Sequence, residues 1–296
     1  MIRKVNNISK FIELIDDRYP EKLKTISNPP NRIYYKGNVE LLKEDGIAII
    51  GTRHITEYGI KMSRKFTKEI ALRDIVVISG MAIGVDTVAH TETLKMGGKT
   101  IAVLGSGFDN IYPKENADLY KKIIDNEGLV ITEFEDNVKP ESSNFPKRNR
   151  IVAALSRTIL VIEAGYRSGT SITAELAWKQ GKCVYAIPGR LDNAYGVGVN
   201  KLIKSGAKLV TDINDILKDF PDWKKKKRRT NTYNLNIKKE YRKIYNVIGE
   251  KPMTIDEIAI KTNNDVICVS KLLVLMELED LVEERLGGYI KKNIEE

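Results

Sequence analysis

Short apolar runs alternate with amphipathic segments over the first two thirds of the chain. Seven runs rich in valine and isoleucine predict β-strands, at Ile47–Ile50, Ile75–Ser79, Thr100–Leu104, Leu129–Thr132, Thr158–Ile162, Lys182–Ile187 and Lys208–Thr211. Segments with helical periodicity lie between them, at roughly Glu57–Arg73, Gly84–Met96, Lys114–Asn126, Lys147–Ser156, Thr170–Gln180 and Asn200–Ser205. Uninterrupted apolar strands are typical of sheets covered by helices on both faces. The pattern therefore predicts an α/β domain with a Rossmann-like, doubly wound, mostly parallel sheet.

A different pattern follows near the carboxyl terminus. Three helical segments are predicted at Lys239–Gly249, Ile255–Lys261 and Val266–Leu278, and Thr254-Ile-Asp-Glu257 has the spacing of a capping box. Gly287-Gly288 can form the tip of a hairpin between Val282–Arg285 and Tyr289–Lys291. Three helices followed by such a hairpin predict a small C-terminal winged-helix domain.

Charge and composition set the domain limits. The 296 residues carry a formal net charge of +9, and the run Lys224–Arg229 alone holds six positive charges. This run follows Pro221 and precedes a polar stretch, so it predicts a basic linker that either touches nucleic acid or an acidic partner or serves only as a soluble connector. We therefore expect a short N-terminal extension at 1–45, a Rossmann-like DNA-binding domain at 46–220, a linker at 221–237 and the winged helix at 238–296.

Several classes of protein are disfavoured by the composition. No apolar run approaches the roughly 20 residues of a membrane-spanning helix, and no signal peptide follows Met1, so the sequence favours a cytoplasmic location. Its two cysteines, Cys183 and Cys268, are too few and too far apart for a disulfide framework or a zinc site. With no sequence cluster of metal-ligating residues, neither a metal nor a cofactor is expected.

Small and polar residues follow several of the predicted strands. Because the carboxyl ends of parallel strands share one edge, we expect these residues to meet there, where open α/β domains bind ligands. Glycine permits close approach of the main chain, and helix N-termini attract anions, so the pattern predicts an anion site. The alternative is that the glycines only form tight turns. The candidate residues are Gly51, Thr52, Arg53, Ser79, Gly80, Gly105, Ser106, Gly107, Ser168, Gly169 and Thr170.

The segment Asn144–Ser156 supplies cations at the predicted start of a helix. Lys147, Arg148 and Arg150 would meet the unfavourable end of the helix dipole, so they predict a compensating anion such as phosphate. Asn149 could address a sugar or base, and Phe145 offers a ring for an unstacked base. Alternatively, the arginines pair with Glu133 or Glu163.

In their order along the chain, these motifs resemble the bacterial DNA processing protein A family (DprA, also called Smf). The resemblance runs from about Tyr19-Pro20 to about Thr211 and includes Ser79–Asp86, Ile101–Gly107, Tyr112-Pro113, Asn144–Arg150 and Pro188-Gly189. It implies a non-enzymatic, homodimeric protein that binds single-stranded DNA, protects incoming DNA and helps to load the RecA recombinase during natural transformation and homologous recombination. The small N-terminal helical domain of many members is expected to be absent or vestigial here.

Two further readings stay open. The chain could be a nucleotide-binding or phosphoribohydrolase-type enzyme of the same Rossmann-like superfamily, with Asp86 and His90 at helical spacing or Glu163 and Glu175 near Ser168–Thr170. Against this, Glu175 falls five residues after Thr170 instead of three.

The winged helix, from Lys238 to the end, has a net charge of −2 and favours protein contact or dimerisation over base reading.

Overall fold

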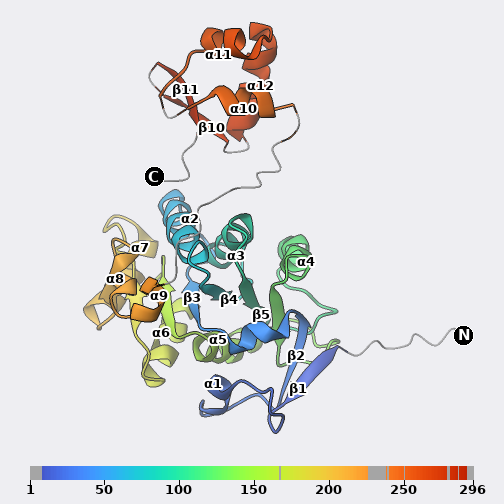
Figure 1. Ribbon diagram of the computed structural model, residues 1–296. Helices are drawn as coiled ribbons and strands as arrows, with labels where there is room; N and C mark the ends of the chain where they lie inside the picture. Colours follow the sequence, from blue (N-terminus) through green and yellow to red (C-terminus); the bar gives the residue numbers. More distant parts are fainter. Residues whose placement is uncertain are drawn as a thin grey trace, which may run out of the picture. The chain divides into compact units, whose positions relative to one another are not determined.

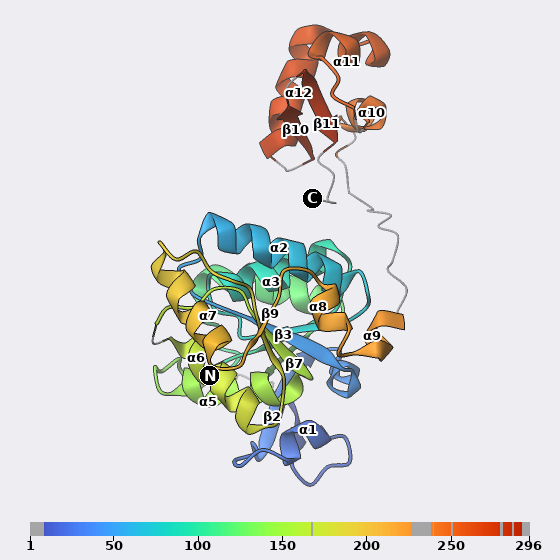
Figure 2. The ribbon, with the colours of Figure 1, turned by 90° about the vertical axis from the view of Figure 1, so that its left-hand side faces the viewer.

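The computed structural model forms two compact units, residues 1–231 and 232–296, which are described separately. Figures 1 and 2 show their elements from two directions. The structure describes residues 9–166, 168–225, 238, 240–249, 251–278, 281–285 and 287–291.

A nine-stranded sheet forms the centre of the first unit, in the order β1-β2-β6-β5-β4-β3-β7-β8-β9. Seven of its strands are mutually parallel and coincide with the seven predicted runs: β3 (Gly46–Ile50), β4 (Val76–Ser79), β5 (Thr100–Val103), β6 (Leu129–Thr132), β7 (Thr158–Val161), β8 (Val184–Ala186) and β9 (Lys208–Leu209). The strand order reverses between β3 and β7, which confirms the doubly wound prediction and creates a crevice at the carboxyl ends of the strands.

Helices bury both faces of this sheet. Ile47 and Ile49 pack with α2 (Glu57–Ala71), α3 (Val85–Lys95), α8 (Asn214–Leu217) and α9 (Pro221–Lys225), whereas Ala48 and Ile50 pack with α1 (Glu21–Lys24), α5 (Asn144–Leu155), α6 (Gly169–Lys179) and α7 (Ala194–Lys204). α4 (Ala117–Asp125) covers β5 and β6 beside α3 (Figure 1). Since neighbouring residues of β3 face opposite layers and both layers are apolar, the strand reads as a continuous hydrophobic run.

The N-terminal segment differs from the prediction. β1 (Lys10–Glu13) pairs antiparallel with β2 (Arg32–Gly37), and β2 pairs antiparallel with β6, so residues assigned to an extension lie in the main sheet. A 3-10 helix, Val39–Lys43, then leads into β3. β1 has only four residues, and β2 is buried in part, so neither gives the continuous apolar signal of the central strands.

The predicted linker also begins inside the first unit. Pro221–Lys225 forms α9, and Trp223 is 1% exposed in the same hydrophobic cluster as the buried face of α2. Arg157 pairs with Asp222 and lies over the ring of Trp223, which fixes this helix to the start of β7. Most of the basic run, from residue 226 onward, lies outside the described residues.

Helix α5 is held at its carboxyl end by Lys182. The Nζ atom of Lys182 donates to the carbonyl oxygens of Ala153, Ala154 and Ser156 at 2.5–2.6 Å. These carbonyls have no partner within the helix, and a cation at this end also opposes the negative pole of the dipole. The contact therefore fixes the helix that carries the predicted arginines.

The second unit confirms the winged-helix prediction. It contains α10 (Arg242–Val247), α11 (Ile255–Thr262), α12 (Val266–Leu278) and the hairpin of β10 (Val282–Arg285) and β11 (Gly288–Lys291). Both bonds of the predicted capping box form between Thr254 and Glu257. Asn263 ends α11 in the left-handed conformation, with a φ of 51°, so the chain can turn at once into α12.

Candidate nucleic-acid interface

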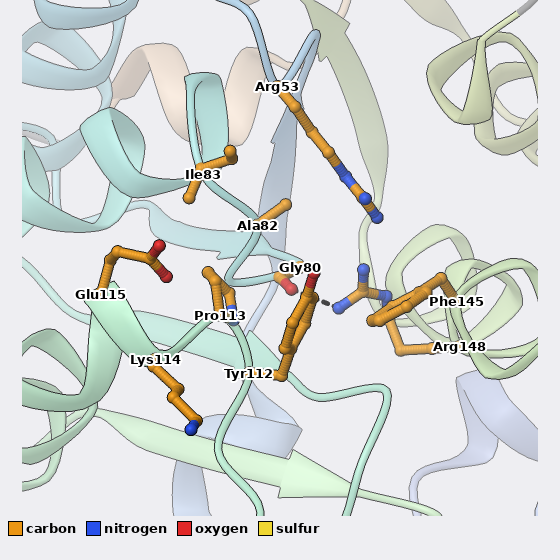
Figure 3. Close-up of a pocket in the computed structure, with 10 residues that line it drawn as sticks. All are labelled: Arg53, Gly80, Ala82, Ile83, Tyr112, Pro113, Lys114, Glu115, Phe145 and Arg148. Carbon is orange, nitrogen blue, oxygen red and sulfur yellow. Dashed lines mark hydrogen bonds between the residues drawn. The ribbon is translucent and has the colours of Figure 1, made fainter. Parts of the chain in front are cut away.

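A pocket of about 250 Å³ opens at the carboxyl ends of β3, β4 and β5 (Figure 3). It brings together residues from the turns after three strands and from the first turns of α5. The lining residues are Arg53, Gly80, Ala82, Ile83, Tyr112, Pro113, Lys114, Glu115, Phe145 and Arg148. Of the sixteen predicted site residues, four therefore line one pocket: Arg53, Gly80, Phe145 and Arg148.

Arg148 forms the floor of this pocket and is only 5% exposed. Its Nη1 donates to the carbonyl oxygens of Gly80 and Val103, which lie at the ends of β4 and β5, and its Nε donates to Asn149 Oδ1 at 3.1 Å. Burial lowers the pKa of Arg148 to about 10, while the nearby Asp86 carboxylate raises it. The guanidinium is therefore charged at neutral pH and locked before any ligand arrives.

Gly80 is required at this position by steric contact. A Cβ added there would lie 2.7 Å from the guanidinium carbon of Arg148. Any other residue would push the arginine away from the two strand ends that it joins. This accounts for the glycine after β4 without assigning it to ligand contact.

Arg53, Phe145 and Tyr112 form the aromatic and cationic wall. The guanidinium carbon of Arg53 lies 5.1 Å from the centroid of the Phe145 ring, and the Tyr112 and Phe145 centroids are 5.6 Å apart at an angle of 40°. Arg53 and Tyr112 are both exposed. In Figure 3 the Arg53 side chain reaches across the pocket toward Phe145 and Arg148. Cations beside exposed rings suit a ligand that has both phosphates and flat bases.

Other predicted residues at the strand ends use their side chains within the fold. The hydroxyls of Ser79 and Ser106 donate to the carbonyls of Ile49 and Asn110, each at 2.7 Å. Thr52 Oγ1 accepts from the backbone of His54 at 3.1 Å. Gly51, Gly105 and Gly107 lie against the side chain of Val85, the ring of Phe145 and the backbone of Glu135, respectively. Close packing thus explains the absence of a side chain at these glycines, and the hydroxyls have partners within the fold.

The three cations of α5 have three different environments. Arg150 forms a salt bridge with Glu133, as the alternative interpretation predicts. Arg148 bonds carbonyls instead of either glutamate, and Glu163 bonds Thr56, with 3.0 Å from the Thr56 amide to Glu163 Oε2. Lys147 is exposed. The helix also begins at Asn144, earlier than predicted, because proline is tolerated in a first turn.

Ser168, Gly169 and Thr170 form the start of α6 beside α5. Ser168 Oγ accepts from the Ser171 amide at 3.4 Å, and Asn149 Nδ2 lies 3.5 Å from the carbonyl oxygen of Gly169. This turn is outside the lining of the pocket, although Asn149 connects it to Arg148. Thr170 is 7% exposed and packs into the fold.

Sequence reasoning missed the loop after β5 as part of the site. This loop supplies four of the ten lining residues, Tyr112, Pro113, Lys114 and Glu115. The sequence indicated Tyr112-Pro113 only through the family resemblance. A tyrosine two residues before a lysine, shortly after the glycine-containing end of β5, is the signal that could have identified it.

Asp86 and His90 do not form a hydrolytic pair. Asp86 accepts from the amides of Gly80 at 3.1 Å and Ala82 at 3.3 Å, and burial raises its pKa. His90 Nδ1 lies 2.7 Å from the Thr100 hydroxyl, which itself donates to Val77 O. The His90 Nδ1 therefore carries the proton and donates it. Burial lowers the pKa of His90 to about 3.

The described part of the chain was predicted to hold neither a metal site nor a membrane span. Among those residues, no group of three or more His, Cys, Asp or Glu side chains could hold a metal ion. None of the described helices combines the length and the apolar character that crossing a membrane requires.

Together, the doubly wound sheet, the cationic pocket at its carboxyl edge and the winged helix define a two-domain protein of the Rossmann-like class. The family model of DNA recombination-mediator protein A matches residues 10–221, and that of the DprA winged helix domain matches residues 236–288. The chain therefore belongs to the DprA/Smf family.

Individual relatives agree with this assignment. The chain is 42% identical to DNA processing protein DprA of Streptococcus pneumoniae over 207 residues, covering 70% of this chain and 73% of the relative. It is 32% identical to protein Smf of Escherichia coli over 279 residues, covering 92% and 75%.

Two solved structures are also similar. The X-ray structure of S. pneumoniae DprA has a TM-score of 0.69 at 41% identity and covers 72% of this chain and 74% of that one. The structure of DNA processing protein A of Helicobacter pylori, which was solved for its single-stranded DNA binding mode, has a TM-score of 0.65 at 30% identity and covers 72% of this chain and 97% of that one.

The buried imidazole predicts an acid-sensitive fold. Because the folded-state pKa of His90 is below its unfolded value of about 6.5, its stabilising contribution is complete above pH 6.5 and is lost as the pH falls toward 3. From pH 7 to pH 5 this loss is about 2 kcal/mol of unfolding free energy. His90→Asn keeps a donor for Thr100 but does not titrate, so its urea-unfolding free energy should fall about 2 kcal/mol less than that of the wild type. Parallel pH profiles would contradict this assignment.

Proposed function

We propose that this protein binds single-stranded DNA through the pocket at the carboxyl edge of its sheet. The supporting observation is that Arg53 and Arg148, about a hundred residues apart in sequence, line one pocket with Phe145 and Tyr112. Arginines supply forked donors for phosphate, and exposed rings stack unpaired bases with little sequence preference. A duplex hides its bases, so this combination suits a single strand.

The wider role that we propose follows from family membership. The protein would protect incoming DNA as a cytoplasmic homodimer and help to load RecA onto it during natural transformation and homologous recombination. This role is supported by the match to the family of DNA recombination-mediator protein A. It is also supported by the single-stranded DNA binding mode of the similar H. pylori protein. We expect the pocket to act by binding alone, without catalytic turnover or a cofactor.

Replacing Arg53 tests the site without disturbing the fold, because this side chain is exposed. Arg53→Ala should weaken binding to oligothymidylate at least about tenfold at low salt, since a charge-assisted contact is lost. The slope of log affinity against log salt should fall by about 0.7, the value for one phosphate of a single strand. Fluorescence anisotropy at several salt concentrations measures both.

Lys43→Ala is the matched control for Arg53→Ala. It removes one exposed cation just before β3, at the opposite edge of the sheet, and should leave affinity and salt slope unchanged. Arg148→Ala is a poorer test, because it leaves the buried Asp86 without its neighbouring positive charge. If Arg53→Ala and Lys43→Ala bind alike, the pocket is not the DNA site.

The competing function is hydrolysis of a nucleotide. The bonding of Asp86 and His90 within the fold supports binding over catalysis, because neither is arranged as an acid or base toward the pocket. Incubation of the protein with the four nucleoside 5′-monophosphates should therefore release no free base, as measured by chromatography. Release above a protein-free blank that is abolished in Arg53→Ala would instead support an enzyme at this pocket.

We also propose that the chain dimerises through its winged helix. One face of α12 places Val269, Leu273 and Met276 in the core, yet the opposite face exposes Ile267 by 65% and Val274 by 49%. Leu275 is 45% exposed on the same side, where Lys271 is the only cation of the helix. Apolar surface of this kind favours contact with a second copy of the chain over contact with phosphates.

Substitution of this face should weaken the dimer. Val274→Asp combined with Leu275→Asp would bury charges at a self-complementary interface, so the dimer dissociation constant should rise at least about tenfold. Light scattering over a concentration series measures it. Lys251→Asp, at an exposed position outside α12, is the control. A dimer unchanged by the double substitution would place the interface elsewhere.

A further inference from the structure

We infer that a single strand bound at the pocket extends to a second stacking subsite, which is formed by His54, Tyr195, Tyr166 and Lys201. This inference rests on the proposed DNA-binding function and extends it. The rings of His54 and Tyr195 are stacked, with centroids 6.2 Å apart at an angle of 24°. The Nζ atom of Lys201 lies 4.7 Å from the centroid of the Tyr166 ring.

The sheet order makes the pocket and this second subsite adjacent. Arg53 of the pocket directly precedes His54, and both follow β3, whereas Tyr166 follows β7 and Tyr195 follows β8. The strands are ordered β5-β4-β3-β7-β8, so rings and cations follow the carboxyl edge of five neighbouring strands. At about 4.8 Å between strands this edge is about 19 Å long, which exceeds the reach of a single nucleotide.

Tyr195 is held in place by the fold. It lies in the first turn of α7, whose start is capped by Asn193 Oδ1 accepting the Tyr195 amide at 2.8 Å. The Tyr195 carbonyl accepts from Ala164 N at 2.9 Å, directly beyond β7. Gly198 permits this contact, because a Cβ there would lie 2.1 Å from the carbonyl oxygen of Gly165. The backbone that carries the tyrosine ring is thus fixed before a ligand binds, and the ring itself stacks on His54.

Two side chains fix the loop that leads to α7 by hydrogen bonds to its backbone. The Asn200 side chain accepts from the Gly189 amide at 3.0 Å and donates to its carbonyl at 2.9 Å. The Tyr58 hydroxyl donates to the carbonyl of Pro188 at 3.0 Å. Both ends of the segment between β8 and Tyr195 are therefore fixed, so little ordering of the loop has to accompany the binding of a base.

The chemistry of the subsite matches that of the pocket. His54 and Lys201 are exposed, and Tyr166 is 56% exposed, so a base can reach an aromatic face and a phosphate can reach the ammonium group. Stacking is tolerant of sequence, since every base has a π-face. The ligand of this subsite is therefore the same unpaired strand, one or more nucleotides beyond the pocket.

Oligonucleotide length separates the two subsites. Tyr195→Ala should bind an oligothymidylate of twelve nucleotides about tenfold more weakly than the wild type does. Its affinity for one of four nucleotides should stay within about twofold of the wild-type affinity. Tyr195→Phe keeps the ring and should match the wild type on both. Lys201→Gln should lower the salt slope by about 0.7 with the longer oligonucleotide only. Leu191→Ala, in the same loop and 89% exposed, is the control.

The outcomes distinguish this inference from the proposed function. If the wild type binds neither oligonucleotide, the DNA-binding function itself fails. If Arg53→Ala weakens both but Tyr195→Ala binds the longer one normally, the function stands and the second subsite is refuted. Equal losses for both lengths in Tyr195→Ala would also refute a separate subsite. The unfolding temperature of each variant should match that of the wild type. If Tyr195→Ala is destabilised, the salt slope of Lys201→Gln decides whether the second subsite exists.

Discussion

The candidate site depends on one buried charge. A guanidinium that is 5% exposed loses most of its hydration, which costs several kcal/mol unless other groups replace the water. For Arg148, the replacements are the carbonyls of Gly80 and Val103 and the field of Asp86. Because those carbonyls end two neighbouring strands, the charge is satisfied only when α5 sits directly over them. The same contact that stabilises the arginine therefore fixes the position of Phe145, one turn earlier on the helix.

The parallel part of the fold was predictable because its strands are buried on both faces. The strands from β3 to β8 are buried in this way and give continuous apolar runs, whereas the short edge strand β9 is exposed. The bounds of all seven match the prediction within two residues. β1 and β2 were missed because an edge pair with partly exposed positions lacks that signal. α5 begins at Asn144, three residues before the predicted start, and Pro146 is accommodated because a first-turn proline has no helical hydrogen bond to lose.

The site was predictable in its location but less so in its members. Strand-end glycines indicated the edge of the sheet where the pocket lies, yet the sequence does not show whether a hydroxyl such as that of Ser79 faces a ligand or a backbone carbonyl. Nor does it show that Arg150 pairs with Glu133 while Arg148, two residues earlier, bonds backbone carbonyls instead. Such pairings depend on contacts between segments far apart in the chain, and Tyr112 joins the site for the same reason.

In the proposed site, the contact between Arg53 and Phe145 links phosphate binding by the arginine to base stacking on the ring. The guanidinium lies over the Phe145 ring, so a base stacks on that face only if Arg53 moves away. Moving it gives up a cation–π contact of about 0.5–1 kcal/mol at an exposed site, which a charge-assisted bond to phosphate exceeds. A strand that presents a phosphate to Arg53 therefore frees the ring for its own base, whereas an isolated base must displace the arginine without that compensation. The geometry thus favours a polynucleotide over a free base as the ligand.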